Sequence, residues 1–232
     1  MFSKGIKDGI PIALGYLSVS FTFGLAAVGC GLKVWQAVLI SITNLTSAGQ
    51  FAGLDIMAAG GGMLEMALAQ LVINIRYSLM SISLSQKADS SMTRFWRLIL
   101  GYGITDEIFA VAVGQNETVG RKYLSGLIIT PVLGWTLGTF LGAFLGNILP
   151  EIVINALGVA IYAMFLAIIL PPARENLKVM VVVIAAVVLS CVMFYVPWLK
   201  EHISAGTSII IAAVISATLG AVFFPIRDEQ KE

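Results

Sequence analysis

An arginine and two acids lie inside stretches that are otherwise apolar enough to cross a membrane. Arg76 occurs in LEMALAQLVINIRYSLMSISLS, residues 64 to 85, and Asp106 and Glu107 occur in GYGITDEIFAVAVG, residues 101 to 114. An arginine near the centre of a spanning helix costs about 2.5 to 3.5 kcal/mol on insertion scales, so it must face protein, water or an anion. Its planar donor fork suits a carboxylate, which belongs either to a substrate or to a side chain in a structural ion pair.

The two acids are the obvious protein partners for Arg76. Two glycines loosen the backbone before Thr105, which is placed to cap a half-helix and to leave Asp106 and Glu107 in its first turn, where the helix dipole favours negative charge. Burial favours the neutral form of a carboxyl group, whereas the dipole and the arginine favour the charged form, so the sequence leaves their protonation open. We expect one acid to pair with Arg76 and the other to titrate.

A second polar cluster lies in the apolar segment that precedes the arginine. SITNLTSAGQFAGLD, residues 41 to 55, contains Asn44, Thr46, Ser47 and Gln50, which are too polar for a surface that faces lipid. Unwound backbone inside a membrane is tolerated only where it is buried in protein or lines a cavity, and transporters use such breaks to expose backbone groups to substrate. We therefore expect a break that lines a substrate cavity; the alternative is a helix packed tightly through small residues.

The composition places these clusters in an integral membrane protein. Of the 232 residues, 58% are hydrophobic and 12% are charged, and the mean hydropathy is +0.94. Soluble domains carry about twice that charged fraction. Apolar segments near the roughly 20 residues that a spanning helix needs recur along almost the whole chain, so no soluble domain of ordinary size fits. The net charge of +1 gives no indication of nucleic-acid binding.

The predicted fold is an all-α, polytopic helix bundle of about seven to eight hydrophobic segments. We expect one transmembrane domain over residues 1–232, with discontinuous or re-entrant helices near residues 41–55 and 101–110. A rough match at an offset near 120 residues suggests an internal repeat that relates residues 9–115 to 123–225. The segments run from about 9 to 31, 35 to 59, 63 to 85, 98 to 114, 123 to 149, 152 to 170, 179 to 198 and 205 to 225.

The connections between segments indicate the orientation, because lysine and arginine favour the cytoplasmic side. If all eight segments crossed fully with the N-terminus inside, the basic cluster at residues 87 to 97 would fall outside. This conflict disappears if the second and fourth segments are re-entrant or broken, as their polar, glycine-rich interiors indicate independently. We therefore expect a multi-pass protein of the cytoplasmic membrane with a cytoplasmic N-terminus.

A glycine repeat in the fifth segment predicts close helix packing. Four glycines at four-residue spacing form a groove along one helix face, where another backbone can approach closely. We favour packing within the chain over a subunit interface. The four are Gly134, Gly138, Gly142 and Gly146.

A set of motifs connects these observations to a known family. The motifs are P-x-x-x-G at the start of the first segment, SAGQF at 47 to 51, NIRYSLMSISL at 74 to 84 and TDEIFA at 105 to 110. Together they resemble the AzlC/YgaZ family, the large subunits of branched-chain amino-acid exporters. The resemblance covers most of the chain, with its specific part in residues 9 to 110. The family's arginine motif often ends in His where this chain has Tyr77.

The resemblance implies export of leucine, isoleucine, valine or similar amino acids such as methionine. It also implies a proton gradient as the driving force and a separately encoded, small AzlD-type membrane subunit as partner.

A zwitterion needs a cation for its carboxylate, an anion or carbonyl groups for its ammonium, and an apolar pocket. Arg76, one of the two acids, and Phe51 with neighbouring aliphatic residues would supply these. We therefore predict that Asn44, Ser47, Gln50, Phe51, Asn74, Arg76 and Tyr77 bind substrate, and that Asp106 and Glu107 couple protons or form an ion pair.

Two other functions stay open at this point. One is a channel for an ion or small solute, in which Asp106 and Glu107 form a charged constriction. The other is a scaffold subunit whose glycine faces hold a partner. We expect no enzyme, because the single histidine lies in a short connection and no pair of nucleophile and base can be assembled. We also expect no metal or cofactor, since Cys30 and Cys191 match no metal or redox spacing.

Overall fold

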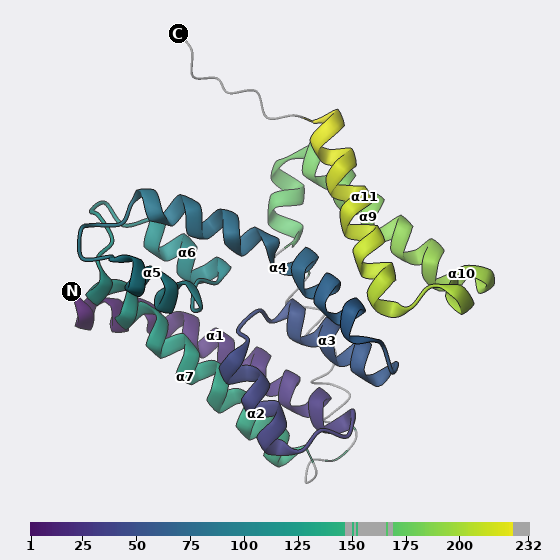
Figure 1. Cartoon of the computed structure of the whole chain (residues 1–232), viewed down its shortest axis with the longest axis horizontal. Helices are drawn as coiled ribbons and strands as arrows, with labels where there is room; N and C mark the ends of the chain where they lie inside the picture. The colour runs from purple at the N-terminus through teal and green to yellow at the C-terminus, as the bar shows by residue number, and fades with distance from the viewer. Residues whose placement is uncertain (147–149, 151, 153–165, 167–168, 225–232) are drawn as a thin grey trace. The chain divides into compact units, whose positions relative to one another are not determined.

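The computed structural model describes residues 1–146, 150, 152, 166 and 169–224, and their regular secondary structure is helical (Figure 1). Five of the described helices are long and apolar enough to cross a membrane, which confirms the predicted helix bundle. They are α1 (Phe2–Gly29), α4 (Met63–Gln86), α7 (Arg121–Leu145), α9 (Leu177–Tyr195) and α11 (Ala205–Phe223). The shorter helices are α2 (Val34–Thr43), α3 (Ala48–Ala58), α5 (Arg94–Gly101), α6 (Asp106–Val113) and α10 (Pro197–His202). Most of the predicted sixth segment, residues 152 to 170, lies outside the described residues.

The chain divides into two compact units. The first contains Met1–Leu54 and Asn74–Ile161, and the second contains Asp55–Ile73 and Tyr162–Glu232. All the acids and the arginine singled out above belong to the first unit. The single transmembrane domain and the internal repeat stay predictions.

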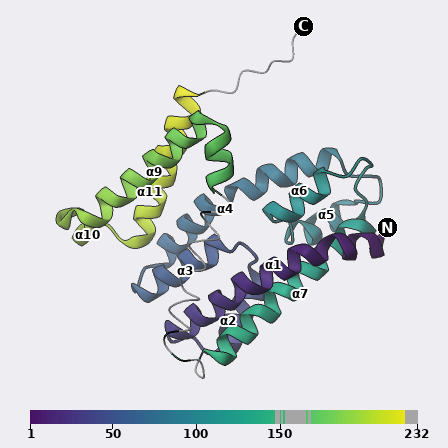
Figure 2. The same cartoon turned by 180° about the vertical axis from the view of Figure 1, so that it is seen from behind.

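Two parallel helices, α1 and α7, form the centre of the first unit and lie side by side in both views (Figures 1 and 2). The two helices run in the same direction, because residues later in α7 contact residues later in α1. Gly134 contacts Ala13, and Gly142 contacts Phe21. A Cβ atom at Gly142 would overlap the backbone carbonyl of Phe21. The glycine groove is therefore used for packing within the chain, as predicted.

We expect Gly142→Ala to destabilise the protein by about 1 to 3 kcal/mol, because the new methyl group would push the two backbones apart. The matched control is Gly15→Ala on α1, where a Cβ atom would meet nothing within 4 Å. The measurement is thermal unfolding in detergent, monitored as the fraction of protein that stays monodisperse on size exclusion. The midpoint temperature should be lower for Gly142→Ala and unchanged for the control. Equal midpoints would show that the contact does not need this glycine.

Both predicted helix breaks are present. The second segment is interrupted between α2 and α3, and the fourth between α5 and α6. In the first break, the backbone N–H of Thr46 donates to Asn44 Oδ1 at 3.1 Å, and Ser47 has a φ of +47°. A left-handed conformation is uncommon for a residue with a side chain and is concentrated at functional sites.

The second predicted segment turns back near the middle of α1. Leu45, in the break, packs against Tyr16 at mid-length of α1. Before and after the break, Ala37 on α2 and Phe51 on α3 both pack in a cluster around Phe23, closer to the C-terminal end of α1. The segment therefore enters from that end and returns toward it.

The fourth predicted segment turns back at the same level but from the opposite end. Thr105, directly before α6, lies 2.6 Å from Tyr16 Oη. Ser91, before α5, accepts a hydrogen bond from the backbone N–H of Arg121 at the start of α7, at 3.0 Å. Gln115, after α6, accepts a hydrogen bond from Lys4 at the start of α1. The two breaks thus reach the middle of α1 from its two ends.

These re-entrant segments remove the predicted charge conflict within the first unit. Lys4 at the start of α1 donates to Gln115 Oε1 at 2.7 Å, and Lys87 after α4 donates to the carbonyl oxygen of Val113 at 2.5 Å. The basic residues at the start of α1 and directly after α4 therefore meet at the same end, as the positive-inside rule requires.

The second unit contains an interhelical cap. Glu65 in the first turn of α4 accepts hydrogen bonds from the hydroxyl of Ser204 and, at 2.9 Å, from the backbone N–H of Gly206. A carboxylate at this position satisfies N–H groups that the first turn of α11 leaves open.

Candidate functional site

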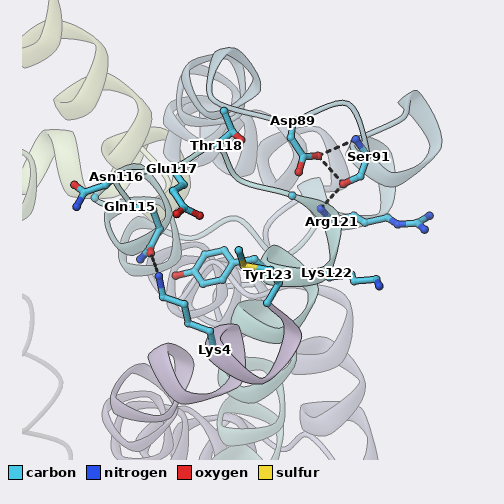
Figure 3. Close-up of a pocket in the computed structure, with 13 residues that line it drawn as sticks. Lys4, Asp89, Ser91, Gln115, Asn116, Glu117, Thr118, Arg121, Lys122 and Tyr123 are labelled. Atoms are coloured by element: carbon cyan, nitrogen blue, oxygen red, sulfur yellow. Dashed lines mark hydrogen bonds between the residues drawn. The ribbon is translucent and has the colours of Figure 1, made fainter.

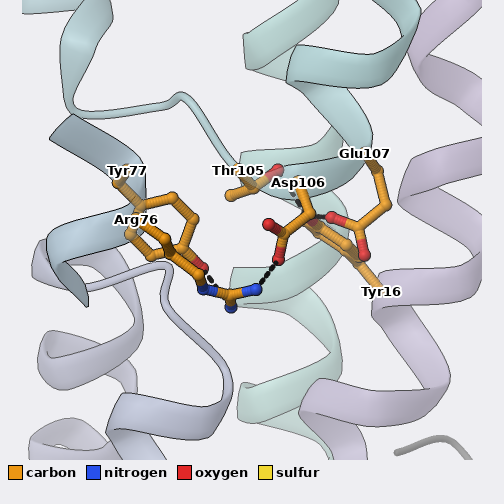
Figure 4. A network of polar contacts seen from close by, with 6 residues as sticks. All are labelled: Tyr16, Arg76, Tyr77, Thr105, Asp106 and Glu107. Carbon is orange, nitrogen blue, oxygen red and sulfur yellow. Dashed lines mark hydrogen bonds and ion pairs between the residues drawn. The ribbon is translucent and has the colours of Figure 1, made fainter. Parts of the chain in front are cut away.

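Arg76 and Asp106 form the predicted ion pair. Arg76 Nη1 lies 2.7 Å from Asp106 Oδ2, and Arg76 Nη2 donates to Tyr77 Oη at 3.2 Å (Figure 4). The guanidinium carbon also lies 4.9 Å from the centre of the Tyr77 ring. The side chains of Arg76 and Asp106 are 44% and 37% exposed. Neither member of the ion pair is therefore fully buried by the described residues.

Glu107 takes a different partner. Its Oε2 lies 2.5 Å from Tyr16 Oη on α1, and the same phenol oxygen lies 2.6 Å from Thr105 Oγ1. A phenol has one proton, so the arrangement is satisfied when Tyr16 donates to Glu107 and Thr105 donates to Tyr16. Adjacent acids in one helical turn are thereby directed to two different helices (Figure 4).

Thr105 is the N-cap residue of α6, with both acids in the first turn, as predicted. Its side chain makes no capping hydrogen bond, however, and this part of the expectation was wrong. The hydroxyl lies against Tyr16 instead, which provides a partner for a phenol that is 9% exposed.

Sequence reasoning missed Tyr16. The available signal was a tyrosine inside the first apolar segment, whereas tyrosines of membrane helices concentrate at the interfaces. A buried phenol needs a hydrogen-bond partner, and nothing in the sequence indicated that a residue 89 positions away would provide it.

A second polar cluster surrounds the break between α2 and α3. Gln50 is 2% exposed, and its Nε2 donates to Ser41 Oγ at 3.1 Å. Ser41 Oγ in turn lies 2.7 Å from Thr139 Oγ1 on α7. These hydrogen bonds connect α3 to α2 and α2 to α7. In addition, three buried oxygens in this break have no hydrogen-bond partner among the described residues, namely Thr46 Oγ1, Ser47 Oγ and Gln50 Oε1.

The two clusters meet around Tyr16. Its ring packs with Leu45 of the first break, and its hydroxyl contacts Thr105 of the second. Tyr102, at the end of α5, also donates a hydrogen bond to the backbone carbonyl of Ile42 in the last turn of α2. The polar parts of both re-entrant segments are therefore neighbours.

The other predicted site residues have more local surroundings. Asn44 uses its side-chain oxygen within the break, and Phe51 packs edge-to-face on Phe23 with ring centres 5.5 Å apart. Asn74 is half-buried on α4, two positions before Arg76. The assignment of all these residues to substrate stays a prediction.

A cavity of about 470 Å³ lies elsewhere, at the N-terminal ends of α1 and α7 (Figure 3). Polar groups there bond to one another: Lys4 donates to Gln115, and Asp89 Oδ1 accepts hydrogen bonds from the backbone N–H and the hydroxyl of Ser91. None of the predicted substrate-binding residues lines this cavity.

Comparisons with known proteins agree with the motifs. The family described as AzlC protein matches residues 11–149, a range that includes both breaks, the ion pair and Tyr16. The inner membrane protein YgaZ of Escherichia coli is 30% identical over 145 residues, which are 59% of this chain and 58% of that protein. An uncharacterized membrane protein of Archaeoglobus fulgidus is 33% identical over 180 residues, 77% of each chain. One of Helicobacter pylori is 29% identical over 128 residues, 52% of this chain and 55% of that protein. No solved structure matches the chain.

Proposed function

Because this chain belongs to the AzlC family and is a polytopic membrane protein, we propose that it is a secondary transporter that exports branched-chain amino acids. Its substrates would be leucine, isoleucine, valine and methionine, moved across the cytoplasmic membrane without chemical change in exchange for protons. A small AzlD-type subunit would be its partner. The N-terminus, with the basic end of the first unit, would face the cytoplasm.

The observation that carries this proposal is the position of the charged network. Arg76, Asp106 and Glu107 lie beside helix breaks that reach the middle of α1 from its two ends. Secondary transporters bind substrate and coupling ion near the membrane midplane, at discontinuous helices of this kind. Charges at that depth are costly and are retained where they serve substrate or ion movement.

The contacts suggest different roles for the three charged groups. Arg76 pairs with Asp106, donates to Tyr77 and keeps 44% of its side chain exposed, so it would anchor the substrate carboxylate. Glu107 has no cation within ion-pair distance among the described residues and faces a phenol, so it would be the group that binds and releases the coupling proton. Asp106 would hold Arg76 in place when no substrate is bound.

The test is movement of radiolabelled leucine in proteoliposomes that contain this chain, with and without the small subunit, under an imposed pH gradient. We expect leucine to accumulate against its concentration gradient and the accumulation to collapse when a protonophore is added. Flux that only equilibrates leucine would favour the channel alternative. Absence of leucine flux in both preparations, with folded protein, would contradict the proposed substrate.

A further inference from the structure

Four buried polar atoms around the first break have no partner among the residues that the structure describes. Three are the oxygens Thr46 Oγ1, Ser47 Oγ and Gln50 Oε1, and the fourth is Trp135 Nε1. The large majority of buried side-chain polar atoms in proteins are hydrogen-bonded, and leaving one without a partner costs about 1 to 3 kcal/mol. Four in one place are therefore a feature that needs an explanation.

The four atoms belong to one neighbourhood. Trp135 is 1% exposed and packs with Leu45 and Tyr16, and Leu45 directly precedes Thr46 in the break. The ring centres of Trp135 and Tyr16 are 5.1 Å apart. Gln50 follows on the first turn of α3. Its amide nitrogen is held by Ser41 Oγ, and this bond leaves the amide oxygen as the unused end.

The chemistry of the four atoms defines what they can bind. An indole N–H only donates and an amide oxygen only accepts, whereas the two hydroxyls do either. A metal ion would satisfy the oxygens but not the indole, and an anion would satisfy the indole but not the amide oxygen. Water satisfies all four, and so does a ligand with a donor and an acceptor close together. The head group of an α-amino acid has an ammonium and a carboxylate bonded to the same carbon atom.

We propose that the break between α2 and α3 binds the ammonium group of the substrate through Gln50 Oε1 and the hydroxyls of Thr46 and Ser47, while Trp135 Nε1 donates to its carboxylate. This inference rests on the proposed function and adds two residues, Thr46 and Trp135, to the site. It also explains why Glu107 is available to bind a proton, because neutral oxygens, rather than either acid, bind the ammonium group. Neutral oxygens can bind the ammonium group and release it again without leaving an unpaired carboxylate behind.

The test combines changes in the protein with changes in the ligand. A background with Trp35, Trp96 and Trp198 replaced by phenylalanine keeps Trp135 as the single tryptophan, and its fluorescence reports binding in purified protein. The ligands are leucine and 4-methylpentanoate, which is leucine without its ammonium group. The variants are Gln50→Leu and Thr46→Val. The matched control is Thr43→Val, because the hydroxyl of Thr43 is already bonded to the carbonyl of Leu39.

We expect Gln50→Leu and Thr46→Val to weaken leucine binding by about tenfold or more, since a hydrogen bond to a charged group is lost. Binding of 4-methylpentanoate should be unchanged, and Thr43→Val should bind both ligands as the background does. If both variants weaken the two ligands equally, the break has only a structural role and the inference is overturned while leucine remains the substrate. If the background binds no leucine, the proposed substrate fails and the inference falls with it.

Discussion

A double variant that neutralises both Arg76 and Asp106 is expected to fold and to remain inactive in leucine transport. Arg76→Gln alone should lower transport by about a hundredfold, because losing one member of a hydrogen-bonded charge pair costs about 2 to 5 kcal/mol. If the pair had only a structural role, Arg76→Gln with Asp106→Asn would remove both charges together and restore much of the activity. We expect no such rescue, because the double variant also lacks the cation that we propose binds the substrate carboxylate.

The measurement is initial leucine counterflow in proteoliposomes, normalised to the amount of monodisperse protein. Arg76→Lys tests the donor fork separately, because lysine keeps the charge and loses the planar pair of donors. It should retain a small part of the activity, less than the parent and more than Arg76→Gln. Recovery of transport in the double variant would show that the ion pair of Figure 4 only holds α4 to α6.

Replacing Glu107 by glutamine is expected to separate leucine exchange from proton-driven accumulation. Glutamine has nearly the same shape and can still bond to Tyr16, so the network that joins α1 to α6 should persist. It cannot exchange a proton, so a pH gradient should no longer drive leucine uphill, whereas counterflow should continue. We expect accumulation to fall to the level of vesicles without a gradient, with counterflow within about threefold of the parent protein.

Asp106→Asn is the matched control for this experiment, because it makes the same chemical change at the neighbouring residue. It should impair counterflow and accumulation together, since it releases Arg76. Tyr16→Phe should lower accumulation more than counterflow, because Glu107 loses its phenol partner but keeps its carboxyl group. Full accumulation by Glu107→Gln would exclude Glu107 as the proton carrier.

The parts of the site that could be predicted are those in which charged or polar groups lie at membrane depth, where exposure to lipid costs free energy. An arginine inside a spanning segment needs a partner other than lipid, so pairing with a nearby acid was expected, and Asp106 Oδ2 is found 2.7 Å from Arg76 Nη1. A polar, glycine-rich stretch at membrane depth indicated broken helices, and both breaks occur. The charge pattern indicated that the same two segments are re-entrant, for the independent reason that basic loops prefer one side.

The parts that could not be predicted depend on which helices meet. The spacing of the α7 glycines marked a packing face, but the parallel partner, α1, follows only from the tertiary structure. Tyr16 and Trp135 are neutral aromatic residues in apolar helices, and such residues are ordinarily core or lipid-facing. Their polar atoms became informative only when the structure showed Tyr16 beside Glu107, and Trp135 Nε1 without a hydrogen-bond partner among the described residues.

The meeting of two re-entrant breaks at the middle of α1 has an electrical consequence. Water that follows each polar segment inward would leave only a thin insulating layer around Tyr16, and most of the transmembrane voltage would fall across it. Moving one charge through the full voltage is worth about 2.3 kcal/mol per 100 mV. The proposed exchange of a zwitterion for one proton would move one net charge, so the transport rate should depend on membrane voltage as well as on pH.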